Sequence, residues 1–374
     1  MKRRDFVKSA GAGAVAGAAA VGAPYVHAQG PRIRWRMATS WPTSLETLYG
    51  GAEDFCKRLS MLTEGRFDVR TYAAGELVGG LQVLDACQSG TAEMGHTASY
   101  YYVGKEPTLA LDTAIPFGMT TRMQNAWMYY GGGSELLNNE VFSNFNIKAF
   151  PGGNTTTQMG GWFRKRVDGL ADLKGLKMRI PGFGGKIMSS LGVNVQTLAA
   201  AEIYPALERG VIDATEFVGP YDDERLGFWQ VAKNYYYPSW WEPSAMFSIY
   251  VNKDAYDKLP DSYKEAIRIA AADSNVRMVA HYDYLNPIAL NKLVERGVKL
   301  RKFSDEIMAA AQKNAFEMYE GMAAENKTWA KVYKHWKDFR DSQYAWHGTN
   351  ELAYTDFALR RVDTSKLGLE TDDS

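Results

Sequence analysis

The amino-acid sequence predicts an α/β fold with largely parallel strands, divided into two lobes. Three observations predict it. Strand and helix patterns alternate along the chain, glycines close the helices, and one short motif occurs twice. The chain has 374 residues, which is enough for two domains or lobes.

The first elements follow in the order strand, helix, strand, helix, strand. Residues 32–37 alternate between polar and apolar side chains, which predicts a strand. In residues 45–62 the apolar side chains recur at gaps of three and four, which predicts an amphipathic helix. The next strand, helix and strand are expected at residues 67–72, 81–89 and 93–96.

The repeated motif consists of the end of a helix, a glycine that stops the helix, and the start of a strand. In both copies an acid follows the glycine by three residues. The motif occurs at residues 85–93 and again at residues 205–213. One such unit in each lobe would give two similar α/β lobes.

The N-terminus has the features of an export signal. Arg3 and Arg4 precede a weakly apolar run at residues 10–23, which is too short to cross a bilayer. Small residues follow, ending at Ala28. We therefore expect residues 1–28 to be a twin-arginine signal peptide and the mature protein to be periplasmic. The alternative is a basic amphipathic N-terminus that stays attached.

Composition and motifs exclude several classes of function. The 43 basic and 43 acidic residues argue against nucleic acid or an anionic membrane as partner. The sequence contains no C-x-x-C, H-E-x-x-H or G-x-S-x-G motif, and the glycines at residues 182–185 lack the flanking residues of a phosphate loop. Whether Cys56 and Cys87 pair in an oxidising compartment stays open.

Isolated polar residues at strand ends are the candidate site. Arg179 lies late in a short strand, before a Pro-Gly turn, where the strands of α/β lobes face a ligand crevice. A guanidinium there can hold a carboxylate through two parallel hydrogen bonds. The alternative is a solvated arginine or an ion pair inside one lobe.

Two glutamates lie in similar positions. Glu216 follows a strand, and Glu242 follows a run of three Tyr and two Trp residues. Buried carboxylates must be paired, protonated or metal-bound, and two at one site repel each other unless a cation lies between them. Carboxylate, carbonyl and amide oxygens suit Na⁺ or Ca²⁺. The alternative is a structural glutamate bonded to tyrosine hydroxyls.

The sequence resembles the solute-binding proteins of TRAP (tripartite ATP-independent periplasmic) transporters over residues 32–361. The runs that carry the resemblance are residues 94–101, 116–118, 173–180, 204–214 and 241–243. The pairs Glu216-Phe217 and Trp241-Glu242 resemble those of the subgroup that binds 2-oxo and 2-hydroxy monocarboxylates, such as pyruvate or lactate, with a metal ion.

The resemblance implies roles for the substrate-binding residues. Arg179 would bind the ligand carboxylate. The amide of Gln158 would reach both the ligand and the metal. Tyr100, Tyr101 and Phe217 would line the pocket, and which of the two tyrosines touches the ligand stays open.

The resemblance also implies a metal site. Glu216 and Glu242 would supply carboxylates, Phe217 its backbone carbonyl and Gln158 its amide oxygen. Sodium is the expected ion, with calcium as the alternative.

The fold implied is a two-lobed periplasmic binding protein with hinge crossovers, a long helix that spans both lobes, and extra C-terminal helices. The expected segments are 29–155 mainly in lobe 1, 156–250 mainly in lobe 2, 251–304 as return segments and spanning helix, and 305–374 as a C-terminal helical segment.

The implied function is capture of a small carboxylate and its delivery to the membrane permease subunits of a TRAP transporter, without catalysis. Its rival is an exported enzyme acting on a small organic acid, with Glu216 or Glu242 as general base.

The C-terminal segment predicts two helices with a break near residues 326–328. The second helix has a bulky apolar stripe that includes Trp329, Val332, Trp336 and Phe339. This stripe must be buried somewhere. It packs either against its own lobes or, after crossing to a partner, in a homodimer.

Overall fold

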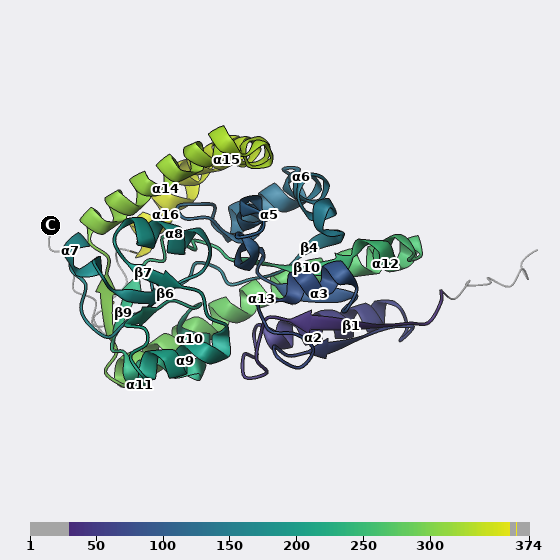
Figure 1. Ribbon diagram of the computed structural model, residues 1–374, viewed down its shortest axis with the longest axis horizontal. Coiled ribbons are helices and arrows are strands. Elements are labelled where there is room, and N and C mark those ends of the chain that lie inside the picture. Colours follow the sequence, from purple (N-terminus) through teal and green to yellow (C-terminus); the bar gives the residue numbers. More distant parts are fainter. Residues whose placement is uncertain (1–29, 360–363, 365–374) are drawn as a thin grey trace, which may run out of the picture. The chain divides into compact units, whose positions relative to one another are not determined.

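The computed structural model describes residues 30–359 and residue 364. The predicted signal peptide, residues 1–28, lies outside the described residues. From Ile33 onward the chain forms one unit that contains two β-sheets with helices packed on them (Figure 1). We call each sheet with its helices a lobe. The prediction of an α/β fold with two lobes is confirmed.

The first sheet has the strand order β2-β1-β3-β10-β4. Strand β1 is parallel to β2 and β3, whereas β10 is antiparallel to β3 and β4. The strands are β1 Ile33–Thr39, β2 Phe67–Tyr72, β3 Met94–Thr97, β4 Ile147–Asn154 and β10 Met246–Asn252. The three strands expected from the sequence in this region are therefore present.

The second sheet has the strand order β11-β9-β5-β8-β6-β7. Strand β6 is parallel to β7 and β8, and β9 is parallel to β11, whereas β5 is antiparallel to β8 and β9. The strands are β5 Trp162–Phe163, β6 Lys177–Arg179, β7 Asn194–Gln196, β8 Ala214–Thr215, β9 Asn234–Tyr237 and β11 Lys299–Lys302. Each sheet thus has one strand that runs against its neighbours.

The helices connect the strands. In the first lobe they are α2 Tyr49–Leu62, α3 Val83–Ser89, α4 Ala110–Thr113, α5 Thr121–Tyr129, α6 Gly133–Glu140 and α12 Lys253–Asp257, with short turns η1 Ser99–Tyr102, η2 Pro107–Leu109 and η3 Phe142–Phe145. In the second lobe they are α7 Leu170–Leu173, α8 Gly182–Ser190, α9 Ala200–Glu208, α10 Pro220–Leu226 and α11 Phe228–Val231. The helix expected from residue 45 begins at Tyr49, because the preceding residues form turns.

The repeated sequence motif has the same structure in both lobes. The glycine three residues before each acid has a positive φ, 76° in the first copy and 70° in the second. A carboxylate oxygen of Glu93 accepts the Arg36 backbone N–H at 2.9 Å, and that of Asp213 accepts the Lys177 backbone N–H at 3.1 Å. Each acid thus ties the start of one strand to the neighbouring parallel strand.

Two short segments, residues 155–161 and 238–245, cross between the two lobes. The two crossing segments are hydrogen-bonded to each other: the Gln158 N–H donates to Glu242 O at 3.3 Å, and the Ser239 N–H donates to Gln158 O at 3.3 Å. The antiparallel strands β5 and β10 follow directly after these crossings. The hinge is therefore a pair of hydrogen-bonded segments rather than two independent linkers.

Helix α13, Asp261–Glu295, is the expected long helix. At about 1.5 Å per residue it is about 50 Å long. It packs on α2 and β4 of the first lobe and on α10 of the second (Figure 1). Pro287 lies inside it, where it removes one helical hydrogen bond.

The C-terminal segment forms α14, Asp305–Glu325, and α15, Lys327–His347, followed by η4, Gly348–Leu352, and α16, Ala353–Leu359. Helix α14 packs on α8 of the second lobe, and α15 packs on α5 and α6 of the first. Residues that this packing buries include Ile307, Ala311, Ala315, Tyr319, Trp329, Val332 and Trp336. The aromatic stripe of α15 is thus largely covered by its own lobes, the first of the two alternatives.

The two cysteines do not pair. Cys56 and Cys87 are both free and buried, and they belong to different hydrophobic clusters. Burial raises the pKa of the Cys56 thiol to about 12. Both side chains therefore act as small apolar core residues.

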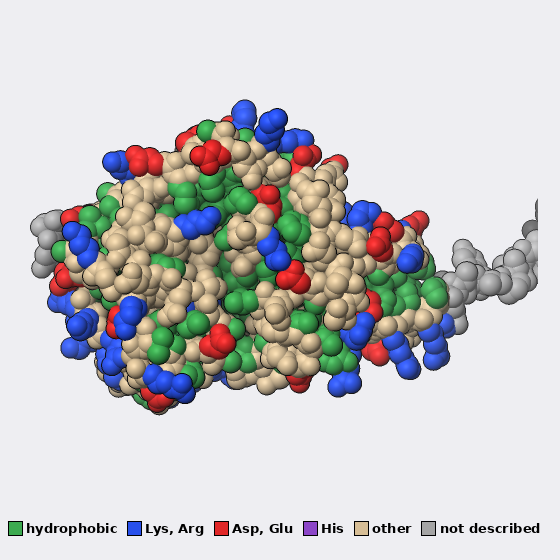
Figure 2. Space-filling view, in the orientation of Figure 1, with side chains coloured by type: hydrophobic (Ala, Val, Ile, Leu, Met, Phe, Trp, Pro, Cys, Tyr) green, Lys and Arg blue, Asp and Glu red, His purple; other side chains and the backbone are tan. Residues whose placement is uncertain are grey.

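The surface carries mixed charge. Acidic and basic side chains are intermingled over most of the face in Figure 2, with hydrophobic side chains between them. Among the described residues, none of the helices has the length and apolarity that crossing a bilayer requires.

Hydrogen bonds join the lobes beside α13. The carboxylate of Asp222, on α10, accepts the Thr47 hydroxyl of the first lobe at 2.8 Å and the Tyr282 hydroxyl of α13 at 2.5 Å. At the surface nearby, Glu46 accepts hydrogen bonds from Tyr221 and Arg225. Asp222 therefore connects three elements that relative movement of the lobes would separate.

We predict that the protein becomes less stable as the pH rises from 5 to 8. Burial raises the pKa of Asp112 and Asp222 to about 6 and that of Asp223 to about 7. The native state then keeps protons that the unfolded chain, with carboxyl pKa values of about 4, releases, so the free energy of unfolding falls through this window. Asp222 alone contributes at most about 3 kcal/mol. Urea denaturation of chelator-treated protein at several pH values measures this slope.

The Asp222→Asn variant serves as the control, because it removes one titrating group and should flatten the slope. A free energy of unfolding that rises from pH 5 to pH 8 would contradict the prediction.

Candidate functional site

The seven residues selected from the sequence gather between the two lobes. They come from η1 of the first lobe, from both crossing segments and from the ends of β6 and β8 in the second lobe. They are Tyr100, Tyr101, Gln158, Arg179, Glu216, Phe217 and Glu242. All except the half-buried Tyr101 are at most 5% exposed, so the lobes are closed over the site.

The sheet register places the central pair. Strands β6 and β8 are parallel neighbours in which Arg179 lies beside Thr215, and the Glu216 N–H donates to Arg179 O at 3.2 Å. The carboxyl ends of both strands meet at the same edge, so the Arg179 and Glu216 side chains emerge together. Sequence alone indicates that both residues end strands, but not that these strands are neighbours.

Arg179 is held by several contacts. Its Nη1 forms an ion pair with the Glu216 carboxylate and donates to Glu216 O at 3.0 Å, while its Nε donates to Leu198 O at 3.2 Å. The guanidinium carbon lies 5.7 Å from the centre of the Phe217 ring. This network fixes the plane of the guanidinium, which also hydrogen-bonds to the Tyr101 side chain and so opposes the rise that burial causes in the pKa of that tyrosine.

The two glutamates have different partners. Burial raises the pKa of Glu216, while the charge of Arg179 opposes that rise. Burial also raises the pKa of Glu242 well above its ordinary value, and the charge of Glu216 raises it further. The ion pair with Arg179 thus favours the ionised form of Glu216, and the negative charge of Glu216 in turn disfavours ionisation of Glu242.

Tyr100 and Gln158 contribute hydrogen bonds to the Glu242 carboxyl, which lower its pKa. The Gln158 amide nitrogen also donates to the Thr155 hydroxyl at 3.1 Å. Gln158 therefore presents its amide oxygen in a fixed orientation.

Three buried oxygens at this site have no hydrogen-bond partner within the described part of the chain: Gln158 Oε1, Glu216 Oε2 and Glu242 Oε2. An unpaired buried acceptor is costly, and two buried carboxylates repel each other. A cation bound by these oxygens would remove both costs. The residues present therefore fit a hard cation with oxygen ligands.

The site differs from a multi-carboxylate metal centre. Over residues 30–359 and 364, the structure contains no group of three or more His, Cys, Asp or Glu side chains placed to bind a metal ion. Two carboxylates and neutral oxygens are what the sequence led us to expect here. The roles of the individual residues remain predictions.

Glycines bring the second lobe close to the first at this site. Gly182 has a φ of 62°, and a Cβ built on it would lie 3.3 Å from Tyr100 Cβ. A Cβ on Gly184 would lie 2.9 Å from Trp241 Cβ. The glycine run that resembles a phosphate loop in sequence thus allows close packing of α8 against η1 and the second crossing.

Two nearby residues, Asp223 and Trp240, carry no distinctive signal in the sequence. Asp223, whose charge raises the pKa of Glu216, is bonded to Trp162 Nε1 at 2.9 Å and the Tyr235 hydroxyl at 2.7 Å. In sequence it is an ordinary acid in the first turn of a helix. In the sequence Trp240 is only one of the aromatic residues that precede Glu242. In the structure its indole N–H is buried and has no acceptor in the described residues.

Comparison with known sequences places the chain among binding proteins. Residues 37–326 match the family described as bacterial extracellular solute-binding protein, family 7. A monocarboxylate 2-oxoacid-binding periplasmic protein from Nostoc is 49% identical to this chain, over 96% of this chain and 99% of the relative.

Comparison with solved structures gives the same fold. A TRAP transporter solute-binding protein from Bordetella bronchiseptica is 43% identical with a TM-score of 0.87, over 88% of this chain and 98% of that one; it is a dimer with copurified calcium and picolinate in one site and an apo second site. One from Pseudoalteromonas atlantica, with bound sodium and pyruvate, is 38% identical with a TM-score of 0.84, over 87% and 99% of the two chains.

We predict that Arg179→Met destabilises the protein, although the methionine is of similar size. The change leaves the Glu216 carboxylate buried without its counter-charge, which costs roughly 3–5 kcal/mol. Adding Glu216→Gln should restore much of the lost stability, because the remaining side chain is neutral. Urea denaturation of the two variants gives the free energies, and equal stability of wild type and Arg179→Met would contradict the assigned ion pair.

Proposed function

This chain belongs to bacterial extracellular solute-binding protein family 7, the solute-binding proteins of TRAP transporters, and we propose that it captures a short 2-oxo monocarboxylate together with a metal cation. The observation that carries the proposal is the set of unpaired buried oxygens of Gln158, Glu216 and Glu242 beside the Arg179 guanidinium. A cation complements the unpaired oxygens, and a ligand carboxylate complements the guanidinium.

We assign the ligand carboxylate to Arg179 and the pocket walls to Tyr100, Tyr101 and Phe217. The guanidinium is already oriented by its bonds to Glu216 and Leu198, so a carboxylate meets donors that need little reorganisation. The ligand is pyruvate or another short 2-oxo acid, with lactate as the 2-hydroxy alternative. The 2-oxoacid-binding relative and the pyruvate-bound structure support this class.

The cation is Na⁺ or Ca²⁺, both of which occur in similar structures. Glu216, Glu242, the Gln158 amide and the Phe217 carbonyl are its proposed ligands. With both glutamates ionised, a bound carboxylate brings the site to two net negative charges, which Ca²⁺ neutralises fully. With a proton on Glu242, Na⁺ neutralises the same site.

Members of this family bind solutes and are not enzymes, so the rival reading of Glu216 or Glu242 as a general base is set aside. We infer that the mature chain works outside the cytoplasm and delivers its ligand to TRAP permease subunits. The paired arginines Arg3 and Arg4 support export by the twin-arginine route.

We predict that removing the cation weakens pyruvate binding more than tenfold, because Glu216 and Glu242 then face the ligand without a compensating charge. Isothermal titration with pyruvate, in chelated sodium-free buffer and after adding back Na⁺ or Ca²⁺, measures this and identifies the ion. Glu242→Gln should lose most of the cation dependence.

Glu208→Gln is the matched control, since Glu208 is exposed on α9 and should leave binding unchanged. A pyruvate dissociation constant that is the same with and without cations would refute the cation site.

We also propose that the chain forms a homodimer through the end of its C-terminal segment. Large apolar side chains are exposed there: Trp346 by 57%, Leu352 by 63%, Tyr354 by 71% and Phe357 by 60%. The similar Bordetella structure is a dimer. The covered stripe of α15 does not require a partner, so residues 344–359 are the proposed contact.

We predict that Trp346→Glu with Phe357→Glu yields a monomer, because charges placed in an apolar interface oppose its burial. Light scattering during size-exclusion chromatography measures the mass. Tyr130→Glu, at a side chain that is 96% exposed in the first lobe, is the control and should leave the mass unchanged. Wild-type protein that elutes as a monomer at all micromolar concentrations would exclude the dimer.

A further inference from the structure

We propose that Tyr344, on α15, is a positioning residue for the cation ligands Glu242 and Gln158. It acts through Phe117 and Trp240, along a continuous series of contacts from the C-terminal segment to the site. This inference rests on the proposed function, and it adds residues outside the site to the determinants of its affinity.

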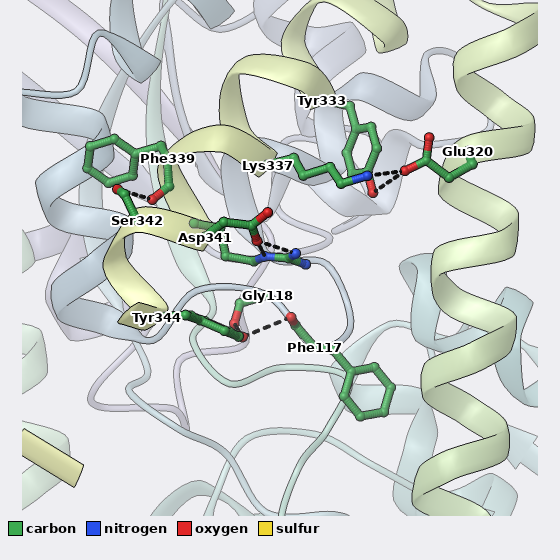
Figure 3. Close-up of polar contacts among 10 residues, drawn as sticks. Phe117, Gly118, Glu320, Tyr333, Lys337, Phe339, Asp341, Ser342 and Tyr344 are labelled. Atoms are coloured by element: carbon green, nitrogen blue, oxygen red, sulfur yellow. Dashed lines mark hydrogen bonds and ion pairs between the residues drawn. The ribbon is translucent and has the colours of Figure 1, made fainter. Parts of the chain in front are cut away.

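The first contact is between Tyr344 and the loop of residues 116–118. The Tyr344 hydroxyl lies 3.0 Å from Phe117 O and 2.7 Å from Gly118 O, and donates to these carbonyls (Figure 3). Tyr319, on α14, donates to Pro116 O at 3.1 Å. Both C-terminal helices thus hold this one loop of the first lobe.

The loop is in a conformation that needs such support. Phe117 has a φ of 54°, which is unusual for a residue other than glycine. A Cβ on Gly118 would lie 2.5 Å from Ile115 O and 3.3 Å from the Trp336 ring, so α15 packs closely over the loop. A strained backbone conformation of this kind persists only when the surrounding structure holds it in place. Here Tyr344, Tyr319 and Trp240 hold it.

The second contact is between Phe117 and Trp240. The Phe117 N–H donates to Trp240 O at 2.8 Å, and the two rings are stacked with centroids 5.4 Å apart at 15°. Backbone and side chain of Trp240 are therefore both set by Phe117.

The third contact is within the turn at residues 239–242. The Glu242 N–H donates to the Ser239 hydroxyl at 3.2 Å, while Ser239 and Glu242 are each bonded to the backbone of Gln158. Trp240 sits in the middle of this turn. A displacement of Trp240 therefore moves Glu242 and Gln158 together, and cation sites depend on oxygen positions to within a few tenths of an ångström.

The alternative is that Tyr344 only fastens α15 to its own lobe. Its side chain is 43% exposed, so it adds little to the core in either case. Tyr333 provides the matched comparison: it lies on the same helix, and its hydroxyl reaches Glu320 of α14 at 3.4 Å rather than the loop (Figure 3).

The test compares Tyr344→Phe with Tyr333→Phe, each of which removes one hydroxyl. Terbium(III), a luminescent substitute for Ca²⁺ that nearby indoles sensitise, is titrated in the absence of organic acid. We expect Tyr344→Phe to raise the Tb³⁺ dissociation constant roughly three- to tenfold, as loss of one hydrogen bond allows, and Tyr333→Phe to leave it unchanged. Melting temperatures without ions should be similar for both variants. Equal Tb³⁺ affinity of the two variants overturns the inference.

A double-mutant cycle tests the route. Phe117→Ala removes the ring stack on Trp240 and should itself weaken Tb³⁺ binding without changing the mass measured by light scattering. Adding Tyr344→Phe to it should then cost little more, because both changes act through one path; full additivity overturns the proposal. If the wild-type protein binds no Tb³⁺, the cation site itself is refuted. If the wild-type protein binds Tb³⁺ and the variants bind it equally well, only the positioning role of Tyr344 is refuted.

Discussion

The structure depends on a buried arginine and two buried carboxylates that do not balance. Arg179 and Glu216 neutralise each other, and Glu242 remains as an excess acid in a closed, apolar setting. Protein interiors tolerate such an excess only with a proton or a counter-ion. The excess negative charge of Glu242 therefore favours a cation at this site, and a cation in turn offsets the charge of a carboxylate placed beside Arg179.

The arrangement of the sheets places these charges where the lobes meet. Arg179 and Glu216 end parallel strands of the second sheet, whereas Glu242 and Gln158 lie on the two crossing segments. The proposed cation ligands are thus divided between one lobe and the hinge, and Tyr100 comes from the other lobe. Bringing them together requires the lobes to close, so binding and closure are energetically one event.

Much of the fold followed from the sequence, because its signals are local. Alternation and helical spacing located the first five elements, and the acid of the repeated motif proved to have the same bond in both lobes, through Glu93 and Asp213. The candidate residues were selected by strand ends, aromatic context and family resemblance, and they do lie together.

What the sequence could not supply were partners distant along the chain. Thr47 and Asp222 are 175 residues apart, and Tyr344 and Phe117 are 227 apart. Each is an ordinary residue in its local context. For the same reason the aromatic stripe of α15 predicted that these side chains are buried, but not that they pack against the lobes of the same chain.

Helix α13 has a mechanical consequence. It is packed on both lobes, so a change in their relative orientation must either bend it or slide it along one of them. Sliding would break the bond between the Asn286 side chain and the Tyr221 N–H, at 3.1 Å. Bending is easiest at the adjacent Pro287, where one helical hydrogen bond is missing. The free energy of bending at this point is one contribution to the closed fraction of the unliganded protein, and the closed fraction scales the apparent affinity of a ligand that binds only the closed form.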